Sequence, residues 1–153
     1  MQNFYSSQTD DISVTEKWDT LWTSSFTPWD KGSASPALVE LLVEKQFHLV
    51  PVGLTGSKGF VPGCGRGYDV ALLAGLTAMN QKFDKVIGLD VSQKAIEEAR
   101  QLHQGKPGNF EFILGDFFSR TQDWEVDGPF DVVYDYTVNY EIRLVANESS
   151  FVP

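Results

Sequence analysis

The sequence predicts an α/β fold with a mostly parallel sheet. Short apolar strands alternate with helical segments along the chain, which is typical of parallel strands joined by right-handed crossovers. The glycine-rich loop "PGCGRG" stands between the first strand and the next helix, as it does in nucleotide-binding α/β units. The 153 residues are enough for one domain with its own core.

Local signals place the elements in order. Ser35 and Pro36 have the pattern of a helix cap followed by proline at the first helical position. Ser92 caps a later helix, and "GKPGN" ends it. The expected elements are a helix over 36–46, a strand over 60–62, a helix over 69–79, a strand over 85–90, a helix over 93–103, and strands over 110–114 and 130–136.

Charge and cysteine content exclude several classes of function. A net charge of -9 and a pI near 4.5 argue against a nucleic acid or an anionic membrane as partner, because both need a basic face. The one cysteine, Cys64, rules out an internal disulfide and favours a reducing compartment. No apolar run has the length of a membrane span, and the start "MQNFYSSQTDD" does not have the form of a signal peptide. We expect a cytoplasmic protein that acts on a small molecule.

The glycine loop has three candidate ligands. A triphosphate loop needs lysine followed by serine or threonine, and the stretch has neither. The dinucleotide pattern needs a glycine three residues after Gly65, where Tyr68 stands. The remaining pattern, with Gly63, Gly65 and Gly67, favours a nucleoside ligand that carries no phosphate.

Two acidic residues follow later strands and support this interpretation. Asp90 stands at the carboxyl end of the second strand, where an acid accepts hydrogen bonds from ribose hydroxyls; the alternative is a helix cap or a turn acid. Asp116 follows the third strand, where it would accept from the adenine amine while Phe117 or Phe118 packs beside the purine. The alternative there is a loop carboxylate beside two core phenylalanines. With the glycine loop, these residues describe a site for S-adenosylmethionine at the switch point of the sheet.

The segments "LWTSSFTPWDKGSASPALVELL", "VPGCGRGYDVALLA", "GLDVS", "GDFF" and "FDVVYDYT" resemble the thiopurine S-methyltransferase superfamily. The likeness covers about residues 16–137 and is greatest to the thiol and halide methyltransferases of fungi and plants. It implies the Rossmann-like class I methyltransferase fold. It also implies S-adenosylmethionine as cofactor and a small thiol, thiolate or halide as methyl acceptor.

The resemblance also implies roles for individual residues. The N-terminal segment that covers the cofactor corresponds to Trp18, Trp22, Trp29 and Asp30. The loop around the methionine part corresponds to Gly63, Cys64, Gly65 and Gly67. The ribose site corresponds to Asp90 and Val91, and the adenine site to Asp116 and Phe117. The segment beside the transferring methyl group corresponds to Tyr134, Asp135, Tyr136 and Thr137. Within this segment, Asp135 and Tyr136 are the catalytic candidates, and Asp135 would either orient the acceptor or bind the cofactor through its backbone.

Physical chemistry is consistent with tryptophans in the covering segment. A sulfonium cation is stabilised by an aromatic face by about 0.5–2 kcal/mol, depending on desolvation. The alternative for each tryptophan is plain hydrophobic anchoring of the segment. Arg66, Tyr68 and Asp69 also match the motif, and we expect structural roles for them. His48 and His103 are expected to be surface or half-buried residues.

The resemblance stops after "YDYT". We therefore divide the chain into a cofactor-covering segment over 1–34, an incomplete S-adenosylmethionine-binding domain over 35–137, and a tail over 138–153 that does not match the family. Strands after the fourth would be missing, through a truncated isoform or an unspliced intron, and the fourth strand would be an open edge able to self-associate. The alternative function is a catalytically inactive cofactor-binding or regulatory protein. A nicotinamide-dependent dehydrogenase ranks third.

Overall fold

The computed structural model describes residues 13–45, 47–50, 55–75, 83–119 and 129–136. Its strands are β1 (Lys58–Pro62), β2 (Lys85–Asp90), β3 (Phe110–Leu114) and β4 (Val132–Val133). They form one sheet in the order β3-β2-β1-β4, and every pairing in it is parallel. The predicted α/β class with a parallel sheet is confirmed.

The strand order places a switch point beside β1. The chain moves from β1 to β2 and β3 on one side, and then returns to β4 on the other side. Pro62 is in register with Leu89, and Asp90 with Leu114, so β1, β2 and β3 end at one edge of the sheet. In open α/β sheets, ligands bind at this carboxyl edge, next to the switch point.

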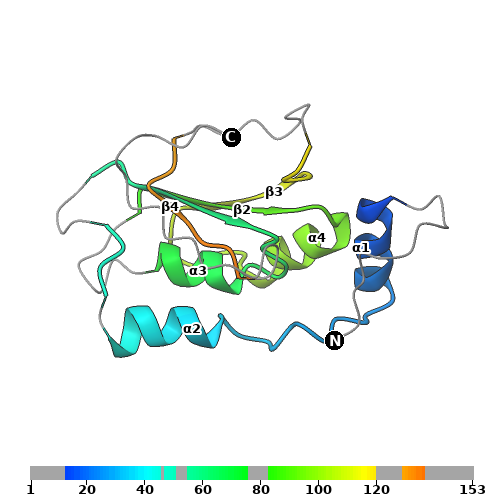
Figure 1. Cartoon of the computed structure of the whole chain (residues 1–153), viewed down its shortest axis with the longest axis horizontal. Helices are drawn as coiled ribbons and strands as arrows, with labels where there is room; N and C mark the ends of the chain where they lie inside the picture. The colour runs from blue at the N-terminus through cyan, green and yellow to red at the C-terminus, as the bar shows by residue number, and fades with distance from the viewer. Residues whose placement is uncertain (1–12, 46, 51–54, 76–82, 120–128, 137–153) are drawn as a thin grey trace.

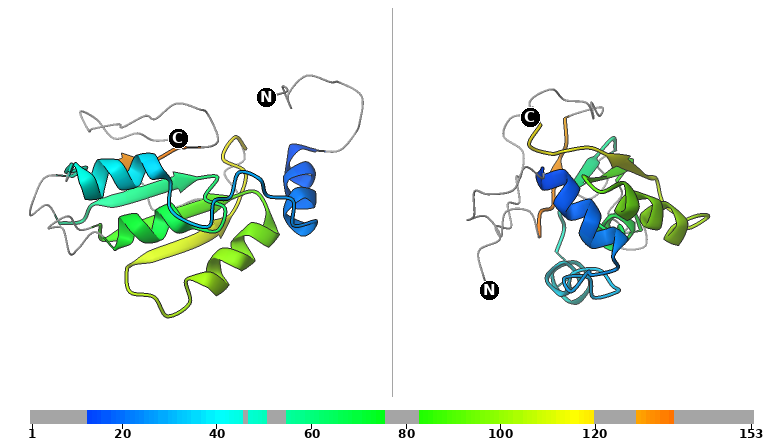
Figure 2. Two further views of the ribbon diagram at one scale, coloured as in Figure 1. Left: turned by 90° about the horizontal axis from the view of Figure 1, so that it is seen from below. Right: turned by 90° about the vertical axis from the view of Figure 1, so that its right-hand side faces the viewer.

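Three helical segments cover one face of the sheet. They are α2 (Pro36–Val39), which continues as the π-helix η1 (Glu40–Glu44), α3 (Tyr68–Ala74) and α4 (Gln93–Leu102). Figure 1 shows them below the sheet, and the left view of Figure 2 shows them in front of it. Both crossovers place their helices on the same face, as right-handed connections require. The core between these layers includes Leu38, Leu42, Val70, Leu73, Val86, Ile96 and Phe112.

A fourth helix, α1 (Val14–Thr23), lies beside α4 at the end of the sheet (Figures 1 and 2). This helix was not among the elements predicted from the sequence. Its start has a capping box, in which the Ser13 side chain accepts from the backbone of Glu16 and the Glu16 carboxylate accepts from the backbone of Ser13. The spacing Ser-x-x-Glu was the signal for this helix.

Several predicted boundaries need correction. The helix after the glycine loop ends at Ala74 with Gly75 as its C-cap, and its expected end at Met79 lies outside the described residues. The strand expected over 130–136 pairs with β1 over two residues only, Val132 and Val133. The expected helix over 36–46 loses its regular α geometry after Val39. His103 was expected to be a surface or half-buried residue, but it is buried, at 4% exposure.

Candidate functional site

The loop between β1 and α3 depends on glycine. Gly63, Gly65 and Gly67 have φ values of 61°, 51° and 75°, a region that side chains with a Cβ rarely adopt. A Cβ on Gly67 would also lie 2.3 Å from the ring of Phe112 on β3. The loop therefore turns sharply against the sheet before α3 begins.

Asp90, the last residue of β2, holds this loop in place. Its Oδ2 accepts a hydrogen bond from the backbone N–H of Gly65 at 2.8 Å, and its Oδ1 accepts from Ser92 at 2.9 Å. The side chain is buried, and burial raises the pKa of its carboxyl. The carboxylate thus links the glycine loop to the start of α4. The structure brings these two predicted features together.

Cys64 is held by the sheet. Its backbone N–H donates to the carbonyl of Leu89 at 2.9 Å, and its sulfur lies against Gly88, where an added Cβ would be 2.9 Å away. Burial raises the pKa of the thiol well above its usual value. A thiol in this state is a poor nucleophile, so its contribution at this position is packing and loop shape.

Arg66 is the one cation within the glycine loop, and two carboxylates bind it. Its Nε donates to Glu98 on α4 at 2.7 Å, and a terminal nitrogen donates to Asp30. Its guanidinium carbon lies 5.4 Å from the centre of the Trp22 ring. The charge is therefore neutralised within the protein and does not face the loop as a phosphate ligand would require.

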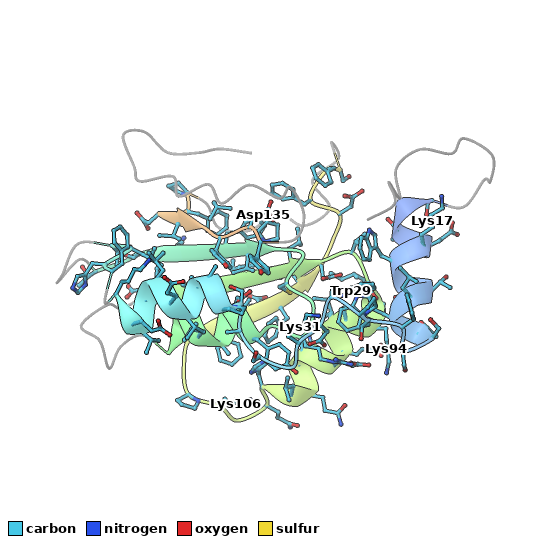
Figure 3. All side chains as sticks on the ribbon, turned by 60° about the horizontal axis from the view of Figure 1, so that its bottom comes forward. Lys17, Trp29, Lys31, Lys94, Lys106 and Asp135 are labelled. Carbon is cyan, nitrogen blue, oxygen red and sulfur yellow. The ribbon has the colours of Figure 1, made fainter. Side chains whose placement is uncertain are left out.

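The three predicted tryptophans form a cluster next to the loop. The Trp18 and Trp29 rings lie 5.2 Å apart, and the Trp22 and Trp29 rings 6.2 Å apart, in edge-to-face arrangements. Trp22 is buried on the glycine loop, with its ring 3.3 Å from the position of a Cβ on Gly65. Figure 3 shows Trp29 between α4 and α1. The structure brings the cluster together at the loop, while its contact with a cofactor stays a prediction.

Asp19, which was not predicted from the sequence, attaches α1 to α4. Its Oδ1 accepts from the Ser92 hydroxyl at 2.7 Å and from the backbone of Lys94 at 3.3 Å. The hydrogen bond from Ser92, and to a smaller extent that from Lys94, lowers the pKa of Asp19. Asp19 is 73 residues from Ser92, and no local pattern in the sequence signals such a pair.

Asp116 and Phe117 follow β3 on the same edge as Asp90. The backbone N–H of Gly115 donates to the Asp90 carbonyl at 2.9 Å, which fixes the end of β3. Asp116 is exposed and accepts from the backbone of Phe118 at 2.9 Å in a tight turn. Phe117 packs against Phe60, 5.9 Å between ring centres, on the face of the sheet opposite the helix-covered core. Their contact with adenine stays a prediction.

The segment after β4 contains the predicted catalytic residues. The Tyr134 hydroxyl is hydrogen-bonded to Ser35, and burial raises its pKa to about 12. Asp135 is buried, and Figure 3 shows it following β4. Tyr136 is exposed, with its ring parallel to that of Tyr134 at 6.5 Å. Thr137 lies outside the described residues.

The Tyr134 hydroxyl faces the core and not the glycine loop. Its partner, Ser35, also donates its backbone N–H to Asp69 Oδ1 at 2.7 Å. Burial raises the pKa of Asp69. This chain of contacts joins α2, α3 and β4, so any contact of Tyr134 with a cofactor would come through its backbone.

Two negative findings apply to the described residues. In those ranges, no group of three or more His, Cys, Asp or Glu side chains is placed to hold a metal ion. Among the described helices, none has the length and apolar character needed to cross a membrane.

Fold and site together define a class of protein. A parallel sheet of order β3-β2-β1-β4, a glycine loop after β1 and an acid at the end of β2 are the features of the class I S-adenosylmethionine-dependent methyltransferase fold. The profile of "Thiopurine S-methyltransferase (TPMT)" matches residues 13–146, and the chain belongs to this family. The predicted resemblance is confirmed.

Similar proteins agree with this assignment. A Brassica oleracea protein named "Thiocyanate methyltransferase 1" is 35% identical over 123 residues, which are 79% of this chain and 47% of that protein. An Arabidopsis thaliana "Probable thiol methyltransferase 2" is 36% identical over 78% of this chain and 46% of its own length. A solved structure described as "Conversion of a Disulfide Bond into a Thioacetal Group during Echinomycin Biosynthesis" has a TM-score of 0.59 and 32% identity, and the match covers 80% of this chain and 46% of that one. The chain spans about half the length of these proteins.

Proposed function

We propose that this chain binds S-adenosylmethionine and acts as a methyltransferase whose acceptor is a small thiol, thiolate or halide. The observation that carries the proposal is the hydrogen bond between the Asp90 carboxylate and the backbone of Gly65. It joins the glycine loop to the acid at the carboxyl edge of β2, beside the switch point. This is where doubly wound folds bind the ribose of a nucleoside.

The residues present fit a nucleoside without phosphates. Arg66 is bound by Asp30 and Glu98, so the loop offers no free cation to a pyrophosphate. Asp90 would repel a phosphate and would accept hydrogen bonds from ribose hydroxyls. The positive φ values of Gly65 and Gly67 keep the loop free of side chains where a ligand would approach the backbone.

The family's cofactor supplies a methyl group on a positively charged sulfur. The chain's own contribution is alignment and charge. Trp18, Trp22 and Trp29 present aromatic surface, and each face stabilises a nearby cation by about 0.5–2 kcal/mol. Asp135 would orient the acceptor or hold the cofactor through its backbone. Thiols with a pKa of about 8.5 are partly ionised near neutral pH, so the acceptor needs positioning more than a strong base.

The relatives support the acceptor class. Their names mention thiocyanate and thiols, both of which present a soft sulfur nucleophile. Halides share this soft, polarisable character. We therefore propose hydrosulfide, thiocyanate, iodide and a small aryl thiol as the acceptors to test, and a cytoplasmic location in keeping with a single reduced cysteine.

Calorimetry tests cofactor binding. The wild-type chain should bind S-adenosylhomocysteine and not NAD, and Asp90→Ala should abolish this binding while far-ultraviolet circular dichroism shows a folded protein. Glu111→Gln is the matched control, because Glu111 also lies in the sheet and is bonded to Lys85, away from the loop. Unchanged affinity in a folded Asp90→Ala protein would refute the ribose site.

A methylation assay tests turnover. Product formed from any of the four acceptors supports the enzymatic function. Tight binding of S-adenosylhomocysteine without any product would instead support the alternative, a cofactor-binding or regulatory protein with no activity of its own.

A further inference from the structure

Arg66 contacts two other parts of the molecule, the N-terminal segment and α4. Its side chain bonds to Asp30 in the N-terminal segment and to Glu98 on α4. Its backbone carbonyl is hydrogen-bonded to Nε2 of His103, the C-cap of α4, at 2.9 Å. A single loop residue thus joins the glycine loop to the N-terminal segment and to the C-terminal half of α4.

The position of Arg66 makes these contacts relevant to the loop. It stands between Gly65 and Gly67, whose positive φ values give the loop its turn. The backbone of Gly65 is held by Asp90, and the guanidinium lies over the Trp22 ring that packs on Gly65. The path of the loop and the position of the tryptophan cluster on it therefore depend on the same residue, Arg66.

Because both side chains are shielded from water, loss of either partner of the Arg66–Asp30 pair should be costly. The Asp30 side chain is 8% exposed and that of Arg66 is 29% exposed. Removal of one partner leaves a charge that water solvates poorly, which costs more than removal of the pair. Asp19 also attaches the N-terminal segment, through Ser92, but that contact does not touch the glycine loop.

We propose that Arg66 is a positioning residue that couples ligand binding at the glycine loop to docking of the N-terminal segment, residues 13–35. The inference rests on the proposed function, since the ligand is the nucleoside cofactor. A ligand that fixes the loop fixes the Arg66 backbone, and this keeps the guanidinium in reach of Asp30. By linkage, docking of the segment raises ligand affinity to the same extent.

Hydrogen exchange of the full chain, with and without S-adenosylhomocysteine, measures this coupling. In the wild type, ligand should slow exchange in the peptide over residues 14–30. In Arg66→Met, which keeps the length and apolar stem but not the charge, that slowing should be lost. The affinity should also fall roughly tenfold, the loss expected for one charge-assisted hydrogen bond.

Asp30→Asn and the double variant Arg66→Met/Asp30→Asn complete the comparison. Each single change should lower the affinity, and the double variant should be no worse than either one, because the two residues act through one contact and the double variant leaves neither of its two charges unpaired. Glu97→Gln is the matched control, because Glu97 is exposed on α4, next to Glu98, and bonds to Gln93 instead of Arg66. Its exchange pattern and affinity should equal those of the wild type.

The outcomes separate this inference from the proposed function. A wild-type chain that binds no S-adenosylhomocysteine refutes the proposed function, and the coupling with it. A wild type that binds, together with an Arg66→Met protein that binds equally well and shows equal slowing of exchange, refutes the coupling alone. Additive effects of Arg66→Met and Asp30→Asn would also contradict it, even when both variants lose thermal stability.

Discussion

Gly67→Ala and Gly105→Ala should differ sharply in their effect on the free energy of unfolding. The two glycines have nearly the same φ, 75° and 74°. A Cβ on Gly67 would lie 2.3 Å from the Phe112 ring, whereas a Cβ on Gly105 would meet no atom within 4 Å. The pair therefore separates the cost of the backbone conformation from the cost of the steric clash.

The magnitudes follow from these two terms. A left-handed conformation costs a residue with a Cβ roughly 1–2 kcal/mol, so Gly105→Ala should lose about this amount. Overpacking in a closely packed core adds about 1–3 kcal/mol, which brings Gly67→Ala to about 2–5 kcal/mol. Since small domains have about 5–15 kcal/mol of total stability, Gly67→Ala takes a large share of it.

Urea unfolding of the full chain, followed by circular dichroism, measures both variants. Addition of Phe112→Leu to Gly67→Ala should recover part of the loss, because leucine lacks the ring atoms that the new Cβ would contact. Equal losses for Gly67→Ala and Gly105→Ala would show that the Phe112 ring does not constrain the loop, and would refute this account of its shape.

Three further predictions concern other parts of the molecule. Ser13→Ala should lower the free energy of unfolding by about 1 kcal/mol in urea titrations, because it removes the side-chain half of the capping box. The Cys64 thiol should react with iodoacetamide at pH 8.5 much more slowly in the folded protein than in urea, because burial raises its pKa. Burial lowers the pKa of His103, so the unfolded state takes up the proton first; stability should decline as pH falls below about 6.5, and less so in His103→Gln.

The sequence was sufficient for the elements whose signals are local. "KVIGLD" and "FEFIL" are short apolar runs, and both are strands with the expected bounds. The start of α4 followed from Ser92, whose side chain accepts from Ala95 as an N-cap does. Helix α1 was not predicted, although Trp18, Leu21 and Trp22 recur at helical spacing and Ser13 and Glu16 form a capping box.

The candidate site also has features that the sequence predicted and features that it did not. The glycine loop and Asp90 stand at places in the chain order that sequence rules address. The contacts that fix the loop could not be predicted by such rules, because Arg66 lies 32 residues from Glu98 and 37 residues from His103 along the chain. Side-chain pairs at such separations are set by how α4 packs on the sheet, and a single sequence carries no periodic signal for them.

The geometry also explains why the residue at position 90 is an acid before any ligand arrives. Two backbone N–H groups, of Gly65 and Ser92, donate to its two oxygens. Asparagine would place an NH₂ group against one of these donors. A carboxylate has about four acceptor sites, so some of them remain open after these two hydrogen bonds. Burial of Asp90, and to a smaller extent the nearby charge of Asp19, raise the pKa of its carboxyl, and the backbone donors oppose them. A ribose diol would add two further donors to the same carboxylate, so ligand binding would reinforce the contact that already shapes the loop.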